Sequence, residues 1–302
     1  MRLCAVSVDL DEIPFYFQIH GLSEPTGTER SLVYQRALAR LTTFANDAQI
    51  PLTLFAIGSD LTPEASVRLK SARDGGHEIG NYSLDHRYDL TRLDRMQIVE
   101  QIDGGAAEIA RAVGERPVGF RAPGYTINDV VFDVLAELGV AYDSSVFPCP
   151  PYWSAKALAM GAIALRGRQS KSILDTPKVL LAPTSPYRVG RPYWTRGKGV
   201  LELPVQVTRG LRLPFIGTTL SLAGPSRARL LAQMCVGEPL INLELHGIDV
   251  LDAEDGLQAL APHQPDVRVP RARKLETLHA VVEMLRKNAY SFVTLREAAS
   301  AL

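Results

Sequence analysis

The chain has 302 residues, 46% of them hydrophobic, and its 33 Lys and Arg residues balance 33 Asp and Glu residues. This composition supports a sizeable core but gives no general attraction for nucleic acid or an anionic membrane, so neither is an expected partner. The sequence lacks an apolar run of about eighteen residues and a basic-then-apolar N-terminus, so we expect neither a transmembrane segment nor a secretory signal. Three cysteines without CxxC spacing read as reduced thiols, and we expect a cytoplasmic protein.

Short apolar strands and longer helices alternate along the first half of the chain. We expect strands at residues 2–8, 52–57, 77–81, 117–120 and 140–142. We expect helices at residues 29–49, 62–74, 94–113 and 128–138, with Thr62 and Asn128 suited as N-caps. Such alternation is typical of a parallel sheet covered by helices. We therefore predict an α/β fold, a distorted (β/α) barrel of about seven parallel strands, in a single domain over residues 1–302.

Two segments break this rhythm. Residues 13–28 contain two prolines and two glycines and are expected to form a loop. Residues 148–219 are rich in proline, with arginine and aromatic residues between the prolines, and we predict an irregular insertion that forms a lid. After this insertion the pattern resumes, with expected elements at residues 226–235, 240–245, 274–287 and 291–295.

Polar residues that suit catalysis fall at the ends of the predicted strands. They are Asp9, Asp11, His86, Arg121, Asp143 and His246. The carboxyl ends of strands in a parallel barrel converge on one face, where such folds place their chemistry. Asp9 and Asp11 are two residues apart, so they lie on the same side of a strand end and repel each other unless a cation or a shared proton intervenes. Taken alone, the acidic pair also suits a solvated turn, and Asp143 also suits a helix cap.

Five segments carry a resemblance to a known family. They are residues 7–12, 76–86, 120–125, 142–147 and 243–247, in this order. The ordered set resembles the motifs of the polysaccharide deacetylases, the NodB-homology domain of carbohydrate esterase family 4. The resemblance implies a hydrolase of carbon–nitrogen (non-peptide) bonds that removes an acetyl-type group from an amino sugar or sugar conjugate.

The resemblance also implies roles for individual residues. Asp9 would be the general base, held by Arg121, and His246 the general acid, tuned by Asp143. Backbone N–H groups near Gly124 or Tyr125 would face the oxyanion.

A divalent metal ion is implied at Asp11 and His86, with zinc as the first choice and nickel, cobalt or manganese as the alternatives. Tyr82 stands where the family has a second histidine ligand, and a neutral phenol is a poor ligand. Three outcomes follow: metal bound more weakly through Asp11, His86 and water; substitution by another side chain, with His20 the nearest candidate; or no metal.

The expected substrate is a small-molecule or lipid-linked N-acyl sugar. Two other functions remain open on the same scaffold. One is a catalytically impaired carbohydrate-binding or regulatory relative, because of Tyr82. The other is a deformylase or another amide hydrolase, because the sequence does not define the acyl group.

Overall fold

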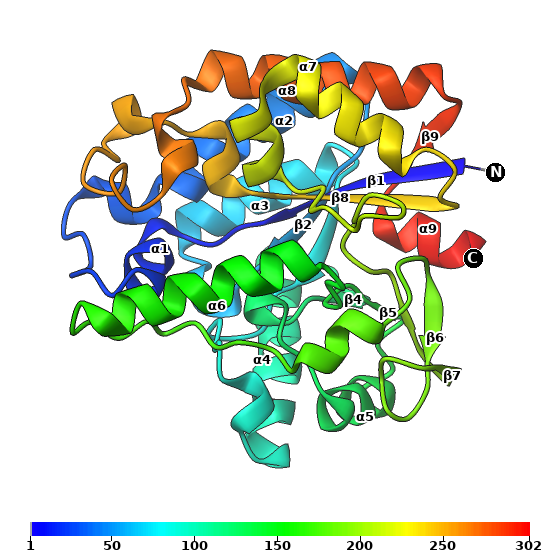
Figure 1. The fold of residues 1–302 in the computed structure, drawn as a ribbon. Helices are drawn as coiled ribbons and strands as arrows, with labels where there is room; N and C mark the ends of the chain where they lie inside the picture. The colour runs from blue at the N-terminus through cyan, green and yellow to red at the C-terminus, as the bar shows by residue number, and fades with distance from the viewer. Residues whose placement is uncertain (1) are drawn as a thin grey trace.

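The computed structural model describes residues 2–302, and a mainly parallel sheet forms its centre (Figure 1). Seven strands pair in parallel in the spatial order β7-β5-β4-β3-β2-β1-β8. Their bounds are β1 (Arg2–Asp9), β2 (Thr53–Ala56), β3 (Glu78–Asn81), β4 (Gly119–Phe120), β5 (Tyr142–Asp143), β7 (Arg196–Glu202) and β8 (Leu240–His246). Strand β6 (Tyr187–Val189) runs antiparallel to β7, and β9 (Tyr290–Phe292) pairs with the start of β1. The predicted α/β fold is confirmed.

The sheet curls into an open barrel, because the segment after β7 connects its two ends. Leu203 N donates to Asp143 O on β5 (2.8 Å), whereas Gln206 N donates to Asn242 O on β8 (3.1 Å). Ile216 adds an isolated parallel bridge to Glu244. These contacts bring the carboxyl ends of β5 and β8 to the same face of the molecule.

Helices cover the outside of the sheet (Figure 1). They are α1 (Ile13–Ile19), α2 (Leu38–Ala48), α3 (Pro63–Asp74), α4 (Arg95–Val113), α5 (Asp129–Glu137), α6 (Pro150–Leu165), α7 (Gly217–Cys235), α8 (Arg271–Lys287) and α9 (Leu295–Ala301). Two predicted caps are confirmed: Thr62 Oγ1 accepts from Ala65 N at 3.2 Å, and Asn128 Oδ1 accepts from Val131 N at 3.0 Å. Within residues 2–302, no helix combines the length and apolar character that crossing a membrane requires.

Residues 148–219 are more regular than predicted. They contain α6, β6, β7 and the start of α7. The prediction of an irregular segment is wrong for α6 because Pro150 and Pro151 occupy the first helical turn, where the missing N–H is not needed. The predicted loop at residues 13–28 likewise contains α1, which Pro14 starts in the same way. Both helices supply side chains to the carboxyl face of the sheet.

Candidate active site

The carboxyl ends of strands β1 and β8 place the predicted base, Asp9, beside the predicted acid, His246. Asp9 is paired in register with His246, as the last residue of each strand. Arg121 follows β4 directly, and its guanidinium reaches Asp9 across the sheet. His86 follows β3 and reaches Asp11. The structure therefore brings Asp9, Asp11, His86, Arg121 and His246 together.

Asp9 and Arg121 form a fully buried ion pair. Arg121 donates to Asp9 Oδ1 at 2.6 Å, to Ser7 Oγ at 2.9 Å and to Ser144 Oγ at 2.7 Å, and its charge lies 4.2 Å from the ring centre of Phe55. Burial raises the pKa of Asp9 to about 6, although the Arg121 charge opposes the shift. The second oxygen, Asp9 Oδ2, is buried without a hydrogen-bond partner. Arg121 thus fixes one oxygen of Asp9 and leaves the other available.

His86 lies in an aromatic enclosure against Asp11. Its Nε2 is 2.8 Å from Asp11 Oδ1. The rings of Phe15, Tyr82 and Tyr88 surround it edge-on, with centroids 4.5, 4.6 and 4.8 Å away. Burial alone would raise the pKa of Asp11, but the nearby His86 imidazole holds it below its usual value. Tyr82 therefore packs beside the metal-ligand candidate, as its sequence position predicts.

The donor atoms present fit a divalent cation. One ligand atom each from Asp9, Asp11 and His246 lies within 4.8 Å of the others; this group differs from the predicted ligand pair of Asp11 and His86, although His86 Nε2 lies 2.8 Å from Asp11 Oδ1. Asp9 Oδ2 and Asp11 Oδ2 are both buried without a partner, which is costly unless a cation or a proton lies between them. Imidazole nitrogen with carboxylate oxygen is a donor set typical of zinc.

His20 does not join this group. Its Nε2 lies 3.0 Å from Gln264 Oε1, and its ring lies beside His263, with a centroid distance of 5.9 Å. The suggestion that His20 replaces the missing ligand is therefore wrong. Phe15 and Tyr16 of α1 line the pocket, whereas His20, the C-cap residue of this helix, is not among the lining residues.

His246 has a different acidic partner from the predicted one. Its Nδ1 lies 2.8 Å from Glu244 Oε1, and Glu244 is fully buried. Burial would lower the pKa of His246, but Glu244, Asp11 and Asp9 raise it well above its usual value. Tyr125 Oη lies 3.4 Å from Nε2. Glu244 thus favours the protonated imidazole that a general acid requires.

Asp143 supports the loop after β4 instead. Its oxygens accept from Ser145 N at 2.9 Å and from Ser145 Oγ at 2.8 Å. Ser145 Oγ in turn accepts from Ala122 N, beside Arg121. Burial raises the pKa of Asp143, which shares its environment with the buried Glu202. The predicted pairing of Asp143 with His246 is therefore replaced by two contacts: Asp143 binds Ser145, and Glu244 is the acid beside His246.

Removing the Glu244 charge should change the pH dependence of turnover. In Glu244→Gln the pKa of His246 falls, so the protonated acid is lost at a lower pH. We expect the alkaline limb of the kcat profile to move down by about one to two pH units. Measurement of kcat from pH 6 to 10 tests this shift, and Asp143→Asn is the matched variant. If the alkaline limb of the kcat profile moves in Asp143→Asn and not in Glu244→Gln, Asp143 tunes His246 as the resemblance implied.

The loop after β4 needs a glycine. Gly124 has φ of +63°, and a Cβ there would lie 2.9 Å from Tyr88 Cδ1. Tyr125 also has a positive φ, of +58°. Tyr125 N donates to Ala122 O at 3.1 Å, so this N–H is engaged within the turn. Of the two N–H groups expected at the oxyanion, Gly124 N is the remaining candidate.

A small pocket of about 80 Å³ opens onto these groups. Its walls combine site residues with aromatic side chains and two residues of α6. They are Asp11, Phe15, Tyr16, Ile19, Tyr82, Tyr88, Gly124, Tyr125, Tyr152, Lys156, Ser172 and His246.

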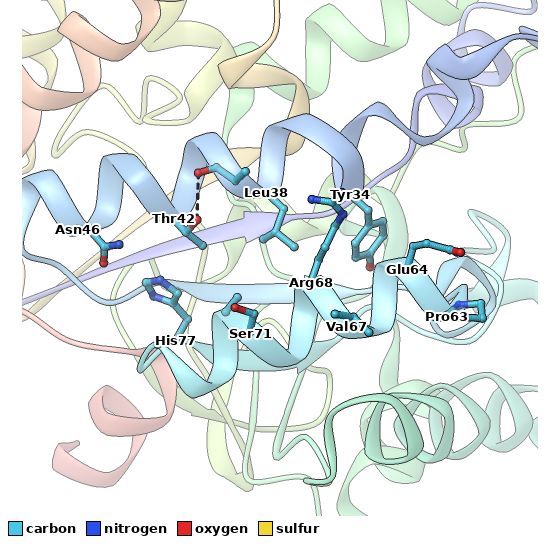
Figure 2. A pocket seen from close by; sticks show the side chains of 13 residues that line it. Tyr34, Leu38, Thr42, Asn46, Pro63, Glu64, Val67, Arg68, Ser71 and His77 are labelled. Atoms are coloured by element: carbon cyan, nitrogen blue, oxygen red, sulfur yellow. Dashed lines mark hydrogen bonds between the residues drawn. The ribbon is translucent and has the colours of Figure 1, made fainter.

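A larger cavity of about 800 Å³ lies elsewhere, between α2 and α3 on the outside of the barrel (Figure 2). Its lining includes Leu38, Thr42, Val67 and Arg68 but none of the strand-end residues. The small pocket, not the larger cavity, is the candidate active site.

Comparison with known proteins shows what the chain resembles. The family model Polysaccharide deacetylase matches residues 32–142. The Bacillus subtilis protein named "Uncharacterized protein YlxY" is 34% identical over 89 residues, which are 30% of this chain and 27% of that protein. The Helicobacter pylori peptidoglycan deacetylase is 24% identical over 147 residues, 48% of this chain and 49% of the relative. The chain thus spans about half or less of the length of these curated relatives.

The fold of this chain is also similar to that of a solved structure. The crystal structure of a candidate polysaccharide deacetylase of Mycobacterium smegmatis matches with a TM-score of 0.60 and 19% identity, covering 99% of this chain and 90% of that one. The family model matches residues 32–142 and the fold is similar to that of this structure, so the resemblance of the chain to the polysaccharide deacetylases is confirmed.

Proposed function

We propose that this protein is a metal-dependent hydrolase that removes an acetyl-type group from an amino sugar or sugar conjugate. One observation carries the proposal: Asp9, Asp11 and His246 converge within 4.8 Å while each acts with a different buried partner. Arg121 holds Asp9, His86 lies against Asp11, and Glu244 lies against His246. This is a base, a cation site and an acid around one small pocket.

The residues divide the work of amide hydrolysis. Asp11 and His86 would hold the metal, zinc by preference, which when bound polarises an amide carbonyl and makes a water more acidic. Asp9 accepts the water proton on Oδ2, the oxygen that Arg121 leaves free. His246 donates a proton from Nε2 to the departing amine, since Glu244 engages Nδ1. Gly124 N would donate to the oxyanion.

The size of the pocket supports a small acyl group. A volume of about 80 Å³ accommodates a small acyl group such as acetyl or formyl. The sugar would lie at the rim, near the aromatic side chains of α1 and α6. The named activity of the Helicobacter pylori relative, peptidoglycan deacetylase, supports an N-acetylated amino sugar.

Acyl release tests the proposal directly. Protein reconstituted with zinc is incubated with N-acetylglucosamine oligomers and with their N-formyl counterparts, and acetate and formate are measured. We expect acetate release that a chelator stops and that added zinc restores. Formate release without acetate release would favour the deformylase. Release of neither acid by metal-loaded protein would contradict hydrolysis and favour a binding relative.

Tyr82 is the one residue that favours a catalytically impaired relative. Its ring packs 4.6 Å from His86 and only 1% of it is exposed, so it occupies the ligand position without offering an anionic oxygen at neutral pH. In Tyr82→His we expect tighter zinc binding and faster acetate release, with Tyr82→Phe as the control that keeps the ring. Equal metal affinity in both variants would show that position 82 does not limit the metal site.

A further inference from the structure

Lys156 brings an ammonium group from α6 into the active-site pocket. Its Nζ donates to Gly124 O at 3.1 Å, and the residue lines the pocket beside Tyr125 and His246. No carboxylate among residues 2–302 lies within 4.0 Å of it as an ion-pair partner. Burial lowers the pKa of Lys156 to about 8, so the group is still mainly cationic at neutral pH. An ammonium has three donors, and the Gly124 carbonyl takes one of them.

A second donor in the same pocket lacks a partner. The Tyr16 side chain is 6% exposed, and its hydroxyl is buried without a hydrogen bond among the described residues. Buried polar groups without partners are uncommon, and each one calls for an explanation. Tyr16 on α1 and Lys156 on α6 therefore leave unmatched donors in one small pocket, from two different elements.

Lys156 is connected to the predicted general acid, His246, through the loop that contains Gly124 and Tyr125. It binds the carbonyl of Gly124, and the next residue, Tyr125, places its hydroxyl 3.4 Å from His246 Nε2. His246 is the group that would protonate the departing amine. Lys156 thus contacts the loop that carries Tyr125, and it lines the same pocket as Asp11 and His246.

We propose that the substrate is an amino sugar that carries an anionic group, a carboxylate or a phosphate, which Lys156 and Tyr16 bind. This inference rests on the proposed deacetylase function and names the class of its substrate. An anion with several acceptor oxygens satisfies both donors at once, and charge-assisted hydrogen bonds in a buried site are the strong ones. It also compensates the ammonium charge, since the buried carboxylate that acts on Lys156, Asp175, forms no ion pair with it within 4.0 Å.

Binding measurements separate this inference from the proposed function. Glucosamine 6-phosphate and muramic acid are the anionic probes, and glucosamine is the neutral one, each titrated calorimetrically into the metal-loaded protein. We expect both anionic probes, or one of them, to bind at least about tenfold more tightly than glucosamine. The two probes distinguish phosphate from carboxylate. Equal or weaker binding of both anionic probes would overturn the proposal.

Variants then assign the effect to Lys156. Lys156→Met should weaken the anionic probe at least about tenfold and leave glucosamine unchanged, whereas Lys156→Arg should retain part of the preference. Lys178→Met, in the same stretch but stacked on Trp194, is the control. Should Lys156→Met fail to fold, Tyr16→Phe keeps the ring and should still reduce the preference for the anion.

A purely structural role for Lys156 predicts another result. If Lys156 only supports the Gly124 loop, its loss weakens the binding of neutral and anionic probes equally. It then also lowers kcat for N-acetyl substrates with and without the anionic group. This result would overturn the proposal. If Lys156 binds the anion, KM rises for the anionic substrate alone. Lys156-dependent anion binding without any acyl release would leave this inference standing and contradict the proposed hydrolysis.

Discussion

Asp9→Asn is expected to reduce acetate release at least a hundredfold, or about 10² to 10⁴-fold, while zinc stays bound. Asparagine retains the shape of the side chain but cannot accept the water proton. Of the two carboxylate oxygens of Asp9, Oδ1 accepts a hydrogen bond from Arg121 and Oδ2 has no hydrogen-bond partner. Turnover and metal content of the same preparation are the two measurements.

Asp133→Asn is the matched control for this prediction. Asp133 also pairs with an arginine, Arg191, at 2.7 Å, but on the surface. We expect its turnover to equal that of the native protein. Turnover of Asp9→Asn within tenfold of the native rate would remove Asp9 as the base.

Arg121→Met should cost about 3–5 kcal/mol in the free energy of unfolding. The guanidinium is fully buried and donates to Asp9, Ser7 and Ser144, so its loss leaves a buried carboxylate and two hydroxyls with fewer partners. The midpoint of urea unfolding measures the change. Arg191→Met removes an exposed partner and should cost less than about 1 kcal/mol.

A double variant shows whether the unpaired charge causes this loss. Asp9→Asn in the Arg121→Met background removes the orphaned carboxylate, so part of the lost stability should return. The pair interacts across a distance of 2.6 Å, and the two single changes are not expected to be additive. Strict additivity would contradict the ion pair as the origin of the effect.

The strand-end rule made most of the site predictable. Parallel strands must end on one face, so Asp9, Arg121 and His246 meet although they are far apart in sequence. The motifs then supplied roles that strand periodicity alone did not. The local capping signals at Thr62 and Asn128 are confirmed because a cap depends only on its own neighbours.

The partners of these residues were harder to predict. Glu244 is two residues before His246, so it lies on the same side of β8, the same spacing that relates Asp9 and Asp11. That spacing was a usable signal for Glu244. Lys156 had no comparable signal, because Pro150 and Pro151 resembled helix breaks and concealed the start of α6.

The metal stoichiometry of the protein shows whether Asp11 belongs to a zinc site. Native protein and Asp11→Asn, each stripped and then reconstituted with zinc, are analysed for bound metal after dialysis. We expect about one equivalent of zinc in the native protein and a large loss in Asp11→Asn, since Asp11 lies 2.8 Å from His86 and converges with Asp9 and His246. Less than about a tenth of an equivalent in the native protein, together with no chelator effect on acetate release, would contradict this expectation.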